Sequence, residues 1–144
     1  MSTIRDVLTK KGTHVATISP DASALEAANA MNKHHCGALC VVKDEALVGV
    51  FTERDLLNKV VSARLDPAST KVADVMTTSV ITCGPNGRND DCVAVMSHRR
   101  VRHLPVLENG KLVGIVSTGD LMALQVEEKQ AFIEDLYEYL HGRT

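Results

Sequence analysis

An internal duplication is the feature of this sequence that most limits how the chain can fold. The segment Val15–Leu56 aligns without a gap to Val80–Leu121, and the identities concentrate near the end of each copy, where Leu47–Gly49 matches Leu112–Gly114. A unit of about 60 residues is marginal alone, because it cannot bury enough of its apolar surface. The duplication therefore predicts two small units that pack together and cover each other's sheets.

A polar stretch, Ala63–Thr70, separates the two copies and carries the strongest turn signal in the middle of the chain. We therefore predict a first repeat over residues 1–66, a second over residues 67–126, and a C-terminal helical extension over residues 127–144. The helix that forms this extension begins inside the second repeat and covers Leu121–Leu140.

Each repeat shows the same order of patterns: a β-rich run ended by proline, an amphipathic helix, two apolar runs around a turn, and a second helix. The predicted strands are His14–Ile18, Ala38–Val42 and Leu47–Phe51, and in the second repeat Ser79–Cys83, Leu104–Leu107 and Leu112–Val116. The predicted helices are Ala24–Lys33 and Glu53–Ala63, and in the second repeat one capped by Asn86 or Asn89 and one from Thr118 onward. This order predicts an α+β fold of two β-α-β-β-α units.

Composition and charge exclude several classes of function. The formal net charge is −2 and aromatic residues make up 3%, which argues against a nucleic-acid surface or a base-stacking platform. No apolar run approaches a membrane span, and the N-terminus lacks the pattern of a secretory signal. The four cysteines form no CxxC motif, so we expect reduced thiols and a cytoplasmic protein without membrane attachment.

A hydroxyl residue and an aspartate recur at the start of the second helix of each repeat. These are Thr52 with Asp55, and Ser117 with Asp120. One interpretation is a capping box, in which the two side chains only satisfy the helix end. The other is a ligand site, because a helix N-terminus attracts anions and a carboxylate there can accept hydrogen bonds from ribose hydroxyls. Recurrence after a matching strand in both repeats favours the ligand site.

The repeated Gly-x-x-(Thr/Ser)-x-x-Asp element, together with Arg102–Val106, resembles the cystathionine-β-synthase (CBS) domain pair, also called a Bateman module. The resemblance covers about residues 3–125. It implies a pseudo-symmetric pair with two clefts for adenosine-containing ligands, namely AMP, ADP, ATP, NAD(H) or S-adenosylmethionine. It also implies a homodimer.

The resemblance further implies that each cleft takes residues from both repeats. Thr52 and Asp55 would hold a ribose whose adenine lies against Ser79 and Val80. The second cleft would combine Ser117 and Asp120 with His14, Val15, Gly37 and Ala38. The phosphate-binding candidates are Arg54, Arg99, Arg100, Arg102 and His103, although Arg99 and Arg100 also fit a solvated helix face. Because most of these cations fall to the Asp55 cleft, we expect that cleft to bind the more highly phosphorylated ligand, or to bind it more tightly.

Other chemistries have weaker support. His34, His35, Cys36 and Cys40 are possible metal ligands, but adjacent histidines in an ordered element point to different sides, so we expect no metal site. Cys83 and Cys92 are typical of small core residues. No motif supplies a nucleophile with its base, so we expect neither catalysis nor a catalytic cofactor.

The predicted C-terminal helix carries an apolar stripe that the repeats do not need. Phe132, Leu136, Tyr139 and Leu140 recur at helical spacing. The stripe packs either on the same chain or against a second subunit. Together these features predict a stand-alone regulatory module that senses a nucleotide and signals to a protein effector. The alternative is a non-covalently associated regulatory subunit of an enzyme or transporter; binding of S-adenosylmethionine, a metal or nucleic acid is less favoured.

Overall fold

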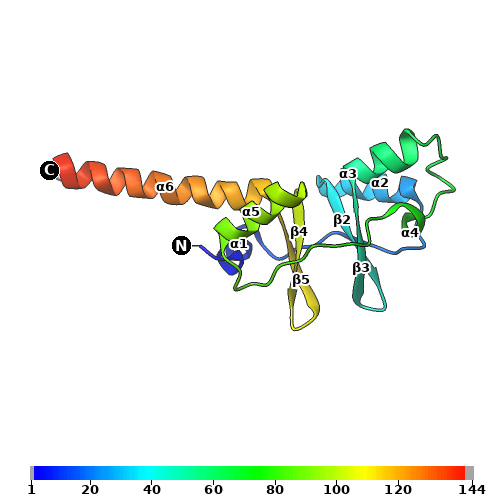
Figure 1. Ribbon diagram of the computed structural model, residues 1–144, viewed down its shortest axis with the longest axis horizontal. Helices are drawn as coiled ribbons and strands as arrows, with labels where there is room; N and C mark the ends of the chain where they lie inside the picture. The colour runs from blue at the N-terminus through cyan, green and yellow to red at the C-terminus, as the bar shows by residue number, and fades with distance from the viewer. Residues whose placement is uncertain (1, 142–144) are drawn as a thin grey trace.

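The computed structural model describes residues 2–141, so the last three residues of the expected extension lie outside it. The chain forms two α+β halves side by side, with one β-hairpin each and the hairpins pointing the same way (Figure 1). The elements up to the middle of the chain are α1 (Ile4–Lys11), β1 (Thr17–Ile18), α2 (Ala24–His34), β2 (Ala38–Lys43), β3 (Ala46–Thr52), α3 (Glu53–Asp55) and the π-helix η1 (Leu56–Val61). Those that follow are α4 (Val72–Val75), α5 (Asn89–Arg99), β4 (His103–Glu108), β5 (Lys111–Ser117) and α6 (Thr118–His141).

The two hairpins have equivalent registers, as the duplication predicts. Ala38 pairs with Thr52 at the open end of the first hairpin, and His103 pairs with Ser117 at the open end of the second. Each hairpin has one bulge in its middle. The hydroxyl residue of the repeated motif is therefore the last residue of a strand, directly before a helix, in both halves.

Both hairpins turn through two residues with positive φ, the backbone of a type I′ turn. Asn109 and Gly110 have φ values of 53° and 78°, which suits this residue pair. Asp44 and Glu45 adopt the same turn with φ values of 50° and 65°. Glutamate in the left-handed region is unfavourable, so the first hairpin keeps its register through the sheet rather than through its turn residues.

Two hydrophobic cores support the halves, and each core receives a helix from the other part of the chain. The first helix, α1, packs with α5, α6 and the second hairpin, whereas α4 packs with α2, η1 and the first hairpin (Figure 1). The buried residues of the core around α1 are Ile4, Val7, Leu8, Cys92, Met96, Leu104, Val106, Val116 and Leu121. Those of the core around α4 are Ala24, Ala27, Met31, Leu39, Val41, Phe51, Val60, Val72 and Val75.

Backbone hydrogen bonds hold this exchange in place at equivalent points. The N–H of Ile4 donates to the carbonyl of Gly87 (2.9 Å), and the N–H of Val72 donates to the carbonyl of Ala22 (2.8 Å). The chain therefore crosses between the halves twice. The crossing brings the segments that follow α1 and α4 alongside the strands of the opposite half.

The sequence-based expectations for the hairpins, for the helix at Ala24–Lys33 and for the long C-terminal helix are confirmed, with ends shifted by a few residues. The α+β class with two repeats is also confirmed. None of the helices within residues 2–141 has the uninterrupted apolar length that crossing a bilayer requires.

The prediction of a strand at Ser79–Cys83 was wrong. In the first half, the N–H of Cys40 donates to the carbonyl of Ala16 and helps to hold β1 beside β2. The residue at the matching position of the second half is Pro105, which has no N–H to donate. Only an isolated bridge between Cys83 and Val106 remains.

The expected caps of the second-repeat helix were also wrong. Arg88 occupies the N-cap position and makes no side-chain cap bond. Asn89 is buried as the first helical residue, and its amide donates to Ser2 Oγ and to the carbonyl of Leu121, each at 3.2 Å. It joins three segments instead of capping the helix. In the first repeat, the helix expected at Glu53–Ala63 begins at Glu53 but continues as a π-helix that ends at Val61.

Candidate ligand-binding clefts

Asp55 sits at the start of α3 with its carboxylate turned inward. It is 6% exposed. Its Oδ2 accepts the backbone N–H of Thr52 (3.0 Å), and the hydroxyl of Thr52 accepts the N–H of Asp55 (3.2 Å), so the pair forms a capping box. The hydroxyl of Thr77 donates to Asp55 Oδ1 (3.0 Å), and Lys59 Nζ lies 3.0 Å from the same oxygen. The capping box and a cleft therefore occur together, because this carboxylate also lines a hollow.

The hollow beside Asp55 has a volume of about 650 Å³ and is lined by both repeats. From the sequence-based set it brings together Gly37, Thr52, Arg54, Asp55, Ser79, Val80, Arg100, Arg102 and His103. Thr77 and Ile81 also line the hollow. They reach it because the segment after α4 runs beside β3, where Val50 and Thr77 donate backbone hydrogen bonds to each other, both 2.9 Å long. Thr77 lies ahead of the aligned part of the second repeat, so the duplication gave no signal for it.

Gly37 keeps one wall of this hollow narrow. The N–H of Glu53 donates to the carbonyl of Gly37 (3.0 Å). A Cβ at Gly37 would lie 2.9 Å from Glu53 Oε1 and 3.6 Å from the ring of His103. The absence of a side chain therefore lets the Glu53 carboxylate and the His103 ring lie against the backbone of Gly37.

A second hollow of about 860 Å³ adjoins the first and shares five lining residues with it, namely Arg54, Arg100, Val101, Arg102 and His103. Its other walls come from α5 and from the start of α6, where Ser117, Thr118 and Gly119 line it. Within residues 2–141, the guanidinium groups of Arg54, Arg100 and Arg102 have no hydrogen-bond or ion-pair partner. Three unpaired cations along the boundary of two hollows favour an anionic ligand.

His103 lies among these arginines as a neutral ring. Burial lowers its pKa below the ordinary value of 6.5, against the opposing effects of Asp120 and Glu53, which raise it. The imidazole is therefore uncharged at neutral pH and can both donate and accept a hydrogen bond.

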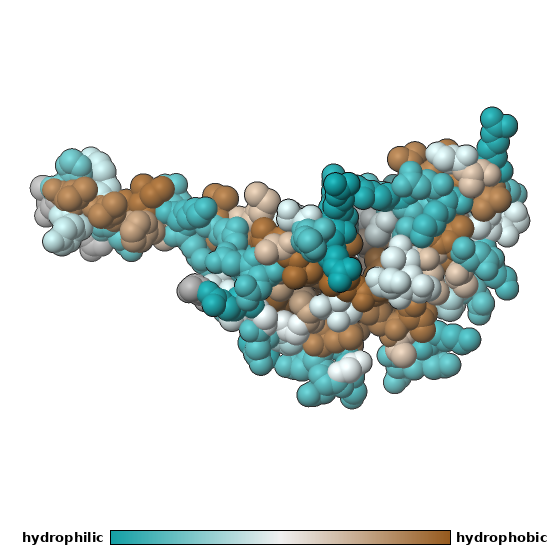
Figure 2. Space-filling view, viewed as in Figure 1, coloured by the Kyte–Doolittle hydropathy of each residue, from teal (hydrophilic) through white to brown (hydrophobic). Residues whose placement is uncertain are grey.

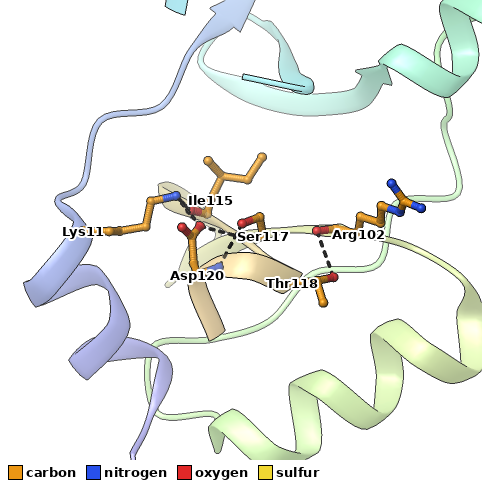
Figure 3. A network of polar contacts seen from close by, with 6 residues as sticks. All are labelled: Lys11, Arg102, Ile115, Ser117, Thr118 and Asp120. Atoms are coloured by element: carbon orange, nitrogen blue, oxygen red, sulfur yellow. Dashed lines mark hydrogen bonds and ion pairs between the residues drawn. The ribbon is translucent and has the colours of Figure 1, made fainter. Parts of the chain in front are cut away.

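Asp120 occupies the equivalent position at the start of α6, and its carboxylate contacts a lysine from another helix, α1. Its Oδ2 accepts the N–H of Ser117 (2.8 Å), and the Ser117 hydroxyl accepts the N–H of Asp120 (3.1 Å). Lys11, from the end of α1, places its Nζ 2.6 Å from the same Oδ2 and donates to the carbonyl of Ile115 at 2.9 Å (Figure 3). Burial alone would raise the pKa of Asp120, but the hydrogen bonds from Lys11 and Ser117 outweigh it and hold the pKa below 3.8.

Several predicted residues line neither of these two hollows. They are His14, Val15, Ala38, Arg99 and Asp120. The ring of His14 lies 5.4 Å from the ring of His34, and Ala38 is buried within β2. Their roles in a ligand site stay predictions.

Three of the four cysteines, Cys40, Cys83 and Cys92, lie in surroundings that hold the thiol in its neutral form. Burial raises the pKa of Cys40 and of Cys83 to about 12, and it raises the pKa of Cys92 as well. Thiols with such pKa values are poor nucleophiles and poor metal ligands at neutral pH. No cluster of three or more histidine, cysteine, aspartate or glutamate side chains that could hold a metal occurs within residues 2–141.

Comparisons with known proteins agree with this architecture. The CBS domain model matches residues 4–62 and 72–127. The CBS domain-containing protein YhcV of Bacillus subtilis is 36% identical over 131 residues, covering 91% of each chain. The crystal structure of the CBS domain protein NE2398 is 41% identical, covers 87% of this chain and 98% of that chain, and superposes with a TM-score of 0.84. The CBS domain pair of protein MJ0100, solved with 5′-methylthioadenosine and S-adenosyl-L-methionine, is 25% identical over 89% of this chain and 98% of that chain, with a TM-score of 0.78. The chain therefore belongs to the CBS domain family and contains one tandem pair of these domains.

Proposed function

We propose that this chain is a non-enzymatic regulatory module that binds an adenosine-containing ligand, AMP, ADP, ATP or NAD(H), in the cleft beside Asp55. The observation that carries the proposal is the composition of that cleft. It combines a buried carboxylate, an uncharged apolar wall and a row of unpaired arginines contributed by both repeats. A ligand with hydroxyls, a flat apolar ring and phosphates matches these three features in one molecule.

Asp55 supplies the group for the ribose. Its two carboxylate oxygens offer more acceptor positions than Thr52, Thr77 and Lys59 use. The Lys59 side chain is 44% exposed, so it can move into solvent while ribose hydroxyls replace it as hydrogen-bond donors to the carboxylate. Val80 and Ile81 supply apolar surface for the adenine.

The arginines supply the phosphate site. Arg54, Arg100 and Arg102 are exposed and unpaired, so they meet an anion without first breaking an ion pair. Because the row continues into the second hollow, the Asp55 cleft has room for more than one phosphate. This supports the expectation that it prefers the more highly phosphorylated ligand.

Titration calorimetry with adenosine, AMP, ATP, NADH and S-adenosylmethionine tests the proposal; the last is included because the related MJ0100 pair was solved with it. Arg102→Ala should weaken ATP binding roughly 10- to 100-fold, the equivalent of one charge-assisted hydrogen bond, while adenosine binding changes little. Arg99→Ala is the matched control, since Arg99 lines neither hollow. The proposal fails if no ligand of this panel binds, or if the two variants lose ATP equally.

The ligand-bound module would signal to another protein. Both repeats line the cleft, so a ligand there contacts both halves and can change how they are held together. A free sensor and a committed subunit of an enzyme or transporter differ in whether the effector stays attached without ligand. Affinity capture of the tagged chain with and without ATP separates the two.

A further inference from the structure

The outer part of α6 has an apolar face that no other part of residues 2–141 covers. Its first turns are fixed to the body: Leu121 is fully buried, Gln125 Nε2 donates to Asp90 Oδ1 (2.6 Å), and Glu127 pairs with Lys10. Beyond this point the helix leaves the body (Figure 1) and carries apolar side chains in the open (Figure 2). The exposed apolar residues are Met122, Val126, Phe132, Ile133, Leu136, Tyr137, Tyr139 and Leu140.

These residues follow the spacing of a two-stranded coiled coil. The positions that alternate by four and three residues along one face are Met122, Val126, Lys129, Ile133, Leu136 and Leu140, of which only Lys129 is polar. Such a repeat marks the seam of a helix pair. With the flanking aromatics, the exposed apolar surface is on the order of 800 Å², about what each partner contributes to a stable interface.

The positions of the charged residues on α6 favour one kind of binding partner over others. The acidic residues Glu127, Glu128, Glu134, Asp135 and Glu138 all lie off the seam. An anionic membrane surface would be repelled by them. The positions that flank the seam, where charges usually choose a different partner chain, are instead uncharged, with Gln125, Gln130, Phe132, Tyr137 and Tyr139. An uncharged border lets the helix meet an identical copy without repulsion.

Lys129 selects the orientation. In a parallel pair it would face the Lys129 of the second copy inside the seam, and like charges there are costly. In an antiparallel pair centred near Ala131, Lys129 lies opposite Ile133, Val126 lies opposite Leu136, and Phe132 comes close to its own copy. Every other seam position then meets an apolar residue. We infer that α6 mediates an antiparallel homodimer through this seam.

The inferred register also brings the dimer contact to the ligand-binding region. Met122 begins the seam and lines the second hollow, beside the arginines. In the antiparallel register, Leu140 of the second copy packs on Met122. The end of one α6 would therefore cover the edge of the basic hollow of the other copy. The inference does not depend on the proposed ligand, because it is argued from the exposure and spacing of the seam residues alone.

Sedimentation velocity of the full chain between about 1 and 100 µM tests the seam. Wild type should sediment as a dimer, and Leu136→Glu should weaken dimerisation roughly 100-fold or more, because it places a charge opposite Val126, where the seam offers no partner for it. Ala131→Glu is the matched control, since it adds the same charge to the outer face and should change the dimer constant less than about threefold. Both residues are exposed in the single chain, so neither variant should unfold it. A monomeric wild type, or equal effects of the two variants, overturns the inference.

Disulfide formation tests the orientation. Under mild oxidation Phe132→Cys should give a covalent dimer and Leu136→Cys should not, because residue 136 lies opposite residue 126 in the antiparallel register. Wild type under the same conditions controls for the native cysteines. Cross-linking of Leu136→Cys alone would show a parallel pair, and cross-linking of neither variant would remove the seam contact. Both results overturn the antiparallel dimer.

Discussion

Lys11 should decide whether the two halves of the pair bind ligand equally. To use Asp120, a ribose must displace the Lys11 ammonium from Oδ2 and from the carbonyl of Ile115, bonds of 2.6 and 2.9 Å. The side chains of Lys11 and Asp120 are 30% and 25% exposed, so water replaces these bonds poorly. A charge-assisted bond is worth about 1.5–3 kcal/mol and a second one about 0.5–1.5 kcal/mol. The cost is thus roughly 2–4.5 kcal/mol, which makes the site roughly 30- to 1,500-fold weaker.

We therefore expect calorimetry to give one tight nucleotide per wild-type chain, and Lys11→Met to add a second. Methionine keeps the length and apolar stem of lysine but removes the ammonium. Lys10→Met is the control, because Lys10 precedes Lys11 on α1 and pairs with Glu127 instead. Two tight sites in wild type, or an unchanged stoichiometry in Lys11→Met, would refute the idea that Lys11 blocks the second site.

The same pair predicts an acid effect with a definite sign. The pKa of Asp120 is held below its ordinary 3.8 in the folded chain. Such a carboxyl stabilises the fold above its unfolded pKa, and that contribution is lost as the pH falls through the lowered folded value. Lys11→Met removes the main favourable partner, so its acid-unfolding midpoint, followed by circular dichroism, should lie at higher pH than that of wild type. A midpoint at the same or lower pH would contradict this.

Three further predictions concern stability and reactivity. In urea titrations, Glu45→Gly should raise the free energy of unfolding by about 1 kcal/mol, because glycine tolerates the φ of 65° at this position better than glutamate. Gly110→Ala should lower the free energy of unfolding by about 1 kcal/mol, because it places a side chain at φ 78°. Gly49→Ala should lower it by about 1–3 kcal/mol, since the new Cβ would lie 2.9 Å from the backbone oxygen of Thr77; a neutral result in the same titration would show that the linker can move. Cys40 should resist a thiol reagent at pH 8 in the native state and react fully in denaturant, as its pKa near 12 implies; rapid native labelling would contradict its burial.

The sequence allowed much of the fold to be predicted, because the duplication repeats its patterns where packing repeats. The hairpins are the clearest case, since Gly49 and Gly114 occupy matching places in both. The prediction of a strand at Ser79–Cys83 was wrong for a local reason, because Pro105 has no N–H to pair with it. Treating the two copies as equivalent hid this difference between them. The sequence also could not predict which core α1 joins, because its apolar face is compatible with both. In the structure, α1 packs in the core of the second half.

The residues predicted for the Asp55 cleft were chosen largely through resemblance; they line one hollow, and their role in binding stays a prediction. Thr77 was missed because it lies outside the aligned copies, and its partnership with Asp55 depends on where the linker runs. Lys11 was missed for the same kind of reason. Its contact with Asp120 joins residues far apart in sequence and exists only because α1 crosses to the other half. Sequence patterns therefore identify the residues that both repeats share at such a site. The residues that differ between the two repeats, here Thr77 and Lys11, come from the segments that cross between the halves.

This crossing also gives the two halves different mechanical roles. At the end of α1, Lys10 holds α6 through Glu127, and its neighbour Lys11 holds Asp120. A ligand that takes Asp120 must move Lys11, and with it the helix end that steadies the stem of α6. The Asp55 half has no equivalent, because α4 ends at Val75 and the segment behind it reaches Asp55 through the short side chain of Thr77. We therefore expect a ligand bound at Asp120 to act on the projecting helix, and a ligand bound at Asp55 to act between the repeats.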